Sequence, residues 1–131
     1  MAVKPGASDV TATNVAWSYR RSVPNTPSYV LAGDELYMVS DKGIATCLDA
    51  KTGTVHWSER VPGAYSASPI YHDGKLWLTN EEGTGVVLQA GKQFRVLAQS
   101  DLKEPTFASF AAVDGVLFVR TEKHLYRFGA K

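Results

Sequence analysis

The residues that could do acid–base or metal chemistry are few in this chain and lie far apart. The three histidines, His56, His72 and His124, lack the close pairing that metal-binding motifs such as HExxH require. We interpret all three as polar positions in strands or turns. A metal site built on any of them would need ligands from outside this sequence, so we predict none.

The single cysteine and the acidic turn residues are the remaining candidates for chemistry. Cys47 lies between Thr46 and Leu48 with no histidine placed to activate it, so we expect a buried structural thiol. A lone cysteine also excludes an intrachain disulfide and a CxxC redox or zinc site. Four carboxylates occupy equivalent turns and are expected to be solvated: Asp41, Glu81, Glu82 and Glu122. We therefore predict no catalytic residue and no bound cofactor.

Composition and charge exclude several classes of protein. The chain has 131 residues with 14 Lys and Arg against 13 Asp and Glu, so it lacks the basic excess typical of nucleic-acid-binding proteins. Its 44% of hydrophobic residues is enough for a modest core, but no apolar run is long enough to span a membrane. Met1 to Asp9 lacks the apolar segment of a secretory signal, as expected for a cytosolic chain, a mature secreted chain or a fragment.

An internal repeat of about 40 residues dominates the sequence. Ser28, Ser68 and Ser109 keep this spacing. A Gly-Asp or Asp-Gly pair follows in each repeat, and after it come a leucine and an aromatic residue: Leu36-Tyr37, Leu76-Trp77 and Leu117-Phe118. Such pairs between short apolar runs are typical of tight β-hairpins. Four short strands in each repeat of this length indicate a β-propeller blade.

These repeats predict an all-β chain that holds about three blades' worth of antiparallel strands. Trp17 and Trp57 lie in similar segments, so the first of them is expected to mark a lone fourth strand. The predicted organisation is an extended lead-in at 1–14 and a blade array at 15–131, divided into a strand and link at 15–26, blades at 27–63 and 64–105, and a three-stranded final blade at 106–131. Three blades are too few to close a ring, so we expect a partial propeller or half of a six-bladed ring.

The segment CLDAKTGTVHW, residues 47–57, resembles the signature of quinoprotein-type, or PQQ-like, β-propeller repeats. In that family a Leu-Asp-x-x-Thr-Gly-x-x-x-Trp turn links the third and fourth strands, and the tryptophan docks onto the turn of a neighbouring blade. The resemblance implies that the docking residues here are Asp49, Thr52, Gly53, Trp57 and Trp17. The motif decays in the second repeat, where we expect Phe94 to replace the tryptophan.

The resemblance covers residues 9–128 and is greatest to the carboxyl-terminal blades of long bacterial members. It implies an exported protein, periplasmic or extracellular, whose last blade receives its fourth strand from the far amino terminus. Quinone dehydrogenases of this family add a catalytic aspartate, a calcium site and often a pair of adjacent cysteines. Because Cys47 stands alone and no such ligands are found, we do not expect an enzyme.

Three functions remain open, and the first is favoured. It is a non-catalytic scaffold for protein interaction or assembly, which either self-associates by strand exchange or joins the missing blades of a longer chain. In a homo-oligomer, residues 15–21 of one copy would complete the blade at 106–128 of another. The alternatives are a fragment of a quinone-dependent dehydrogenase and a propeller that binds carbohydrate or another ligand. Most aromatic residues recur at repeat positions, which favours packing between blades over ligand binding.

Overall fold

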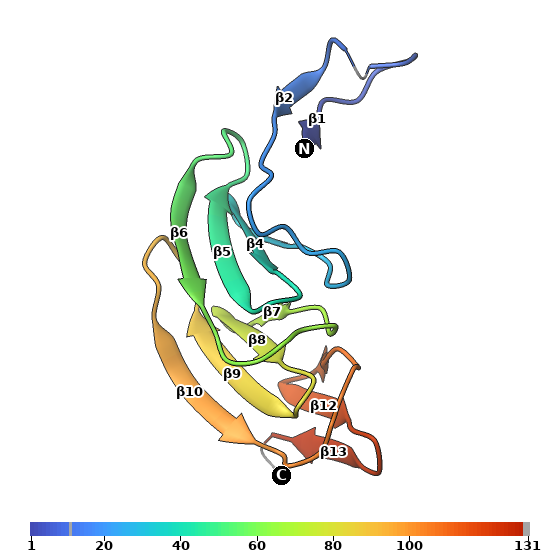
Figure 1. Ribbon diagram of the computed structural model, residues 1–131, viewed down its shortest axis with the longest axis vertical. Helices are drawn as coiled ribbons and strands as arrows, with labels where there is room; N and C mark the ends of the chain where they lie inside the picture. The colour runs from blue at the N-terminus through green and yellow to red at the C-terminus, as the bar shows by residue number, and fades with distance from the viewer. Residues whose placement is uncertain (11, 130–131) are drawn as a thin grey trace.

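The computed structural model describes residues 1–10 and 12–129, and every regular element in this part of the chain is a β-strand. The strands form four antiparallel sheets that follow one another along the chain. In Figure 1 the sheets form a curved row, with the amino-terminal pair of strands at one end and β13 at the other. The predicted all-β class, with partial β-propeller architecture, is confirmed.

Two of the sheets are complete blades of four strands, each in sequence order. The first blade contains β3 (Val30–Ala32), β4 (Glu35–Val39), β5 (Ile44–Asp49) and β6 (Val55–Arg60). The second contains β7 (Ile70–His72), β8 (Lys75–Thr79), β9 (Thr84–Gln89) and β10 (Val96–Asp101). The third sheet has three strands, β11 (Ala111–Val113), β12 (Val116–Arg120) and β13 (Leu125–Phe128). Residues 130 and 131, which the prediction assigned to the final blade, lie outside the described residues.

The Asp-Gly pairs form the first turn of the second and third blades. Asp73 and Gly74 have φ values of 50° and 69°, and Asp114 and Gly115 have φ values of 48° and 74°. Two successive residues at positive φ are what a two-residue hairpin of type I′ requires, because its twist matches that of the flanking strands. The sequence signal therefore placed the innermost hairpin of each of these blades.

The amino-terminal region differs from the expected extended lead-in and lone strand. Strand β1 (Ala2–Val3) pairs with β2 (Val15–Trp17), and the Lys4 N–H donates to the Asn14 carbonyl. A lone strand would leave a row of backbone groups without partners, and the nearby chain supplies a short partner instead. Residue 11, also in the predicted lead-in, lies outside the described residues.

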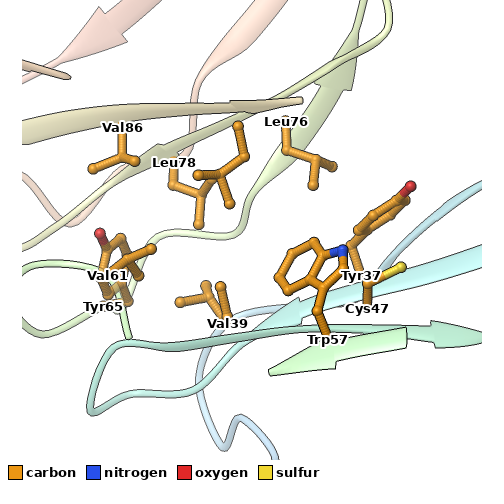
Figure 2. Packing of buried hydrophobic residues seen from close by; sticks show 11 residues of the cluster. Tyr37, Val39, Cys47, Trp57, Val61, Tyr65, Leu76, Leu78 and Val86 are labelled. Atoms are coloured by element: carbon orange, nitrogen blue, oxygen red, sulfur yellow. The ribbon is translucent and has the colours of Figure 1, made fainter. Parts of the chain in front are cut away.

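The core lies between the first and second blades. Because side chains alternate between the two faces of a strand, each blade presents one apolar row to each neighbour. Figure 2 shows Trp57, Tyr37 and Cys47 together on the first blade, with Leu76 of the second blade across from them. The cluster contains Tyr37, Val39, Ala45, Cys47, Trp57, Val61, Tyr65, Leu76, Leu78, Val86 and Leu88. The hydrophobic effect therefore holds these two blades against one another.

Candidate functional site: the junctions between blades

Trp57 joins the first blade to the second. Its Nε1–H donates to the Gly91 carbonyl at 2.9 Å, and its ring meets that of Phe94 edge-on at 5.2 Å. The hydroxyl of Tyr37 accepts a hydrogen bond from the Gly91 N–H at 2.7 Å. The turn that follows β9 is thus held from the first blade through both backbone groups of one glycine.

Trp17 makes the equivalent contact one junction earlier. Its Nε1–H donates to the Ala50 carbonyl at 3.0 Å, in the turn between β5 and β6. A Cβ atom at Gly53 would lie 2.6 Å from the Trp17 ring, and Gly53 has a φ of 74°. Only glycine allows both this backbone conformation and this close approach of the indole.

Asp49 and Thr52 shape the turn on which Trp17 lies. The Asp49 carboxylate accepts hydrogen bonds from the N–H groups of Lys51 at 2.9 Å and Thr52 at 2.8 Å, and from the Thr52 hydroxyl at 3.0 Å. The Thr52 backbone bond is the main reason that the pKa of Asp49 lies below its usual value. The structure therefore brings Trp17, Asp49, Thr52 and Gly53 to one junction, and it places Trp57 at the next.

Phe94 does not replace the tryptophan of the second repeat, contrary to the expectation. In the first blade Trp57 pairs with Cys47, whereas in the second blade Ala98 pairs with Val87, the residue equivalent to Cys47. Phe94 precedes the strand and packs against Trp57 from the neighbouring blade. Leu48 pairs with Val55 in the first blade and Leu88 pairs with Val96 in the second, so the turn before β10 is longer by one residue than the turn before β6. This extra residue moves Phe94 out of the strand position of Trp57, and letter-by-letter comparison of the repeats does not detect it.

A ladder of three serines links the innermost strands. The Ser28 N–H donates to the Ser68 hydroxyl at 2.9 Å, and the Ser68 N–H donates to the Ser109 hydroxyl at 2.9 Å. Repeat spacing picked out these serines, but it did not reveal that the hydroxyls of Ser68 and Ser109 each accept a backbone N–H from the preceding repeat. Their regular recurrence was the signal that could have suggested this role.

Two of the acidic turn residues do more than face solvent. The Asp41 carboxylate accepts hydrogen bonds from the N–H groups of Asn25 at 2.7 Å and Thr26 at 3.2 Å, and the first of these is the main cause of its lowered pKa. Glu81 accepts a hydrogen bond from the Ser66 hydroxyl at 2.5 Å. Asp41 and Glu81 are half-buried, because the linker that enters each blade passes over its turn. Glu82 and Glu122 are exposed, as expected.

Cys47 is fully buried, as predicted for a structural thiol. Burial raises its pKa to about 11, so the reactive thiolate is not populated at neutral pH. His124 lies beside Glu104, with Nδ1 and Oε1 2.6 Å apart. Within residues 1–10 and 12–129, no group of three or more His, Cys, Asp or Glu side chains is placed to hold a metal ion. The same residues contain no helix that could cross a membrane.

Solved structures share the fold at low sequence identity. BamB from Moraxella catarrhalis matches 77% of this chain with a TM-score of 0.64 and 18% identity, and the match spans 32% of its own length. A europium-containing methanol dehydrogenase matches 79% of this chain with a TM-score of 0.65 and 17% identity, over 22% of its length. The quinohemoprotein alcohol dehydrogenase ADHIIG from Pseudomonas putida HK5 matches 79% with a TM-score of 0.63 and 14% identity, over 17% of its length.

Sequence comparison gives one curated relative and one family. The polyvinylalcohol dehydrogenase of Sphingopyxis sp. (strain 113P3) is 29% identical over 62 residues, which are 47% of this chain and 10% of the relative. The chain thus spans less than a third of the dehydrogenases and about a third of BamB. A family model described as outer membrane protein assembly factor BamB matches residues 7–103. The chain therefore belongs to this BamB family of PQQ-like β-propeller proteins.

Proposed function

We propose that this chain is a non-catalytic propeller module that serves as a scaffold for protein interaction or assembly. The observation that carries the proposal is the free edge of β13, which pairs with β12 and with no other strand of residues 1–10 and 12–129. The complete blades have a fourth strand in this position, β6 or β10. An edge of this kind presents unpaired N–H and C=O groups that a strand from another protein can satisfy.

The acidic residues support a structural rather than a chemical role. Asp41 and Glu81, the half-buried carboxylates of the turns, are engaged in holding linkers through hydrogen bonds from Asn25, Thr26 and Ser66. A general acid or base needs a carboxylate that can reach a substrate. BamB, whose family includes this chain, carries the description of an assembly factor, and this description agrees with a scaffold.

The first occupant we propose for the free edge is β2 of a second copy. In the complete first blade, Trp57 of the fourth strand pairs with Cys47, which pairs with Tyr37. In the third blade Arg127 pairs with Phe118, the residue equivalent to Tyr37. Trp17 of a second copy would therefore pair with Arg127. Two copies joined head to tail in this way would complete both unfinished ends.

Strand β1 competes with this exchange. Ala2 pairs with Trp17 in the same way that Cys47 pairs with Trp57 in the first blade. Strand β1 therefore occupies the edge of β2 with which β13 of a second copy would have to pair. The competing strand has only two residues, Ala2–Val3, and its pairing is irregular. Four residues of β13 would replace two residues of β1, and this difference favours the exchange at high protein concentration.

Molar mass measured by light scattering at increasing protein concentration tests the proposal. We expect a shift from the 14.2 kDa of one chain towards about 28 kDa, the mass of a closed pair. Lys4→Pro should lower the concentration at which the pair forms, because proline cannot donate the backbone hydrogen bond from Lys4 to Asn14 that holds β1 beside β2. Lys4→Ala keeps this backbone donor and serves as the matched control. A mass near 14 kDa for all three proteins at every concentration would contradict the exchange.

A second candidate function is favoured by the sequence match to polyvinylalcohol dehydrogenase. The resemblance to quinone dehydrogenases implies a quinone and a calcium ion. Residues 1–10 and 12–129 contain no group of three or more His, Cys, Asp or Glu side chains placed to hold a metal ion, and Cys47 is a single buried cysteine. Adding pyrroloquinoline quinone with calcium and following the absorbance of a redox dye distinguishes the candidates, since a scaffold should give no dye reduction.

A further inference from the structure

The junction between the second and third blades contains a cavity that the preceding junction lacks. It measures about 340 Å³ and is lined by Trp77, Val87, Phe110, Leu117 and Phe128, among others. At the equivalent place between the first and second blades, the space beside Tyr37, Trp57 and Leu76 is only about 10 Å³. The two junctions are built from equivalent strands, so specific substitutions between repeats must account for the difference.

The first substitution places alanine at the strand position of Trp57. In the first blade the row that faces the next blade reads Tyr37, Cys47, Trp57 across neighbouring strands. In the second blade the same row reads Trp77, Val87, Ala98. Ala98 therefore takes the strand position of Trp57, whose ring is 8% exposed and packs against Phe94. Ala98 is exposed and too small to cover this side of the junction, and the cavity is lined by its neighbour in the sheet, Val87.

The second substitution lies in the adjacent row, where Gly85 of the second blade takes the place of Ala45 of the first. Val39, Ala45 and Glu59 form this row in the first blade, and Thr79, Gly85 and Ser100 form it in the second. Gly85 lines the cavity, and a Cβ atom placed there would have the Ser100 hydroxyl as its nearest neighbour, at 3.2 Å. The backbone of Gly85 is not at positive φ, so this glycine is not needed for a turn. Its absent side chain enlarges the cavity.

We propose that this cavity is a binding site for a free, planar aromatic molecule of about the size of indole. At the preceding junction the indole of Trp57 lies beside Tyr37 and Leu76, and only about 10 Å³ remains open there. The walls supply aromatic surface, since the rings of Trp77 and Phe110 meet edge-on at 6.5 Å. His72, Asp73 and Ser100 also line the cavity, where they can bond to a polar group on the ligand. Its volume is in the range of small-molecule pockets, and apolar cavities left by missing side chains bind aromatic molecules.

Nuclear magnetic resonance of the 15N-labelled protein, titrated with unlabelled indole, tests the site directly. The chain has three tryptophans, so it gives three indole N–H resonances. The Trp77 resonance should move with increasing indole and then saturate, because this ring forms the wall of the cavity. The resonance of Trp57, which lies in the closed junction, should stay unchanged and acts as an internal reference.

A matched pair of valine variants locates the site. Gly85→Val puts two methyl groups into the cavity and should weaken indole binding about tenfold or more, as expected when a hydrophobic pocket loses space. Gln99→Val is the control, because Gln99 is exposed and lies between Ala98 and Ser100 on the opposite face of β10. It should bind indole as the parent protein does. Thermal unfolding of both variants checks that they are folded.

Three outcomes would overturn the proposal. The first is a Trp77 resonance that does not move, or that moves without saturating. The second is a folded Gly85→Val protein that binds indole as tightly as the parent. The third is a tryptophan-containing peptide that shifts the Trp77 resonance when free indole does not, which would assign the cavity to a protein side chain. None of these results depends on strand exchange, so this test and the molar-mass test can fail separately.

Discussion

At the scale of single residues, the indole of Trp57 makes two contributions to the contact between blades. It buries a large apolar surface between two blades, and its N–H satisfies the Gly91 carbonyl in the turn of the second blade. The Trp17 N–H makes the equivalent hydrogen bond, to the Ala50 carbonyl, at the preceding junction. Its ring is only half-buried, because β2 belongs to a two-stranded sheet and not to a complete blade. The same residue type is therefore expected to contribute less to stability at position 17 than at position 57.

Replacing these tryptophans tests that ranking. Trp57→Ala should lower the free energy of unfolding by about 3–5 kcal/mol, as the removal of large buried aromatic side chains does. Trp17→Ala should cost clearly less, because less of its surface is removed from water. Chemical denaturation gives both values. A cost below about 1 kcal/mol for Trp57→Ala would reject its role in holding the blades together.

At the scale of elements, the serine ladder holds the innermost strands of neighbouring blades at fixed distances. Ser68 accepts the Ser28 N–H on its hydroxyl and donates its own N–H to the Ser109 hydroxyl. Backbone pairing within a blade ends at its innermost strand, so these bonds carry the connection from blade to blade. They are exposed to water, and each should contribute little more than about 0.5 kcal/mol.

Two serine variants form a matched pair for amide hydrogen exchange. Ser68→Ala removes the acceptor of the Ser28 N–H and should speed exchange at Ser28. Ser109→Ala removes the acceptor of the Ser68 N–H and should speed exchange at Ser68 instead. Each variant thus serves as the control for the other, and global stability should hardly change. Unchanged exchange at both amides would show that the ladder is not a stable feature in solution.

Most elements could be predicted from the sequence because hairpins are local. Asp73-Gly74 and Asp114-Gly115 fix their turns with neighbouring residues alone, so the strands beside them were found to within a few residues. Strand β1 was missed because its pairing with β2 bridges a polar segment without periodicity. The roles of Asp41 and Glu81 depend on where a linker crosses the blade, which local patterns do not encode.

The candidate site was only partly accessible to sequence reasoning. The family signature picked out Trp17, Asp49, Thr52, Gly53 and Trp57, and the structure places these residues at two successive junctions. The cavity at the third junction was not foreseen. It depends on the extra residue in the turn before β10, which puts Ala98 at the strand position of Trp57, and on the spacing of two sheets. Neither property follows from the residue types alone.

At the scale of the whole molecule, the row of blades ends differently on its two sides. One end carries β2 with the short strand β1 beside it, and the other end carries β13 with a free edge (Figure 1). An incomplete array of blades leaves backbone groups and apolar surface facing solvent, because each blade normally covers its neighbour. A strand from another protein that pairs with β13 would satisfy these backbone groups and cover part of the apolar surface.

Amide hydrogen exchange of β13 in the presence of a peptide of residues 13–21 tests the central claim most directly. We predict that added peptide slows exchange of the outward-facing amides between Leu125 and Phe128, because the peptide pairs with the edge of β13. The peptide contains β2 but not β1, so no strand competes for this pairing. A control peptide with proline in place of Ala16 should protect these amides less, because it lacks a backbone donor within the strand. Exchange at β13 that stays the same with either peptide would contradict the claim that this edge binds protein strands.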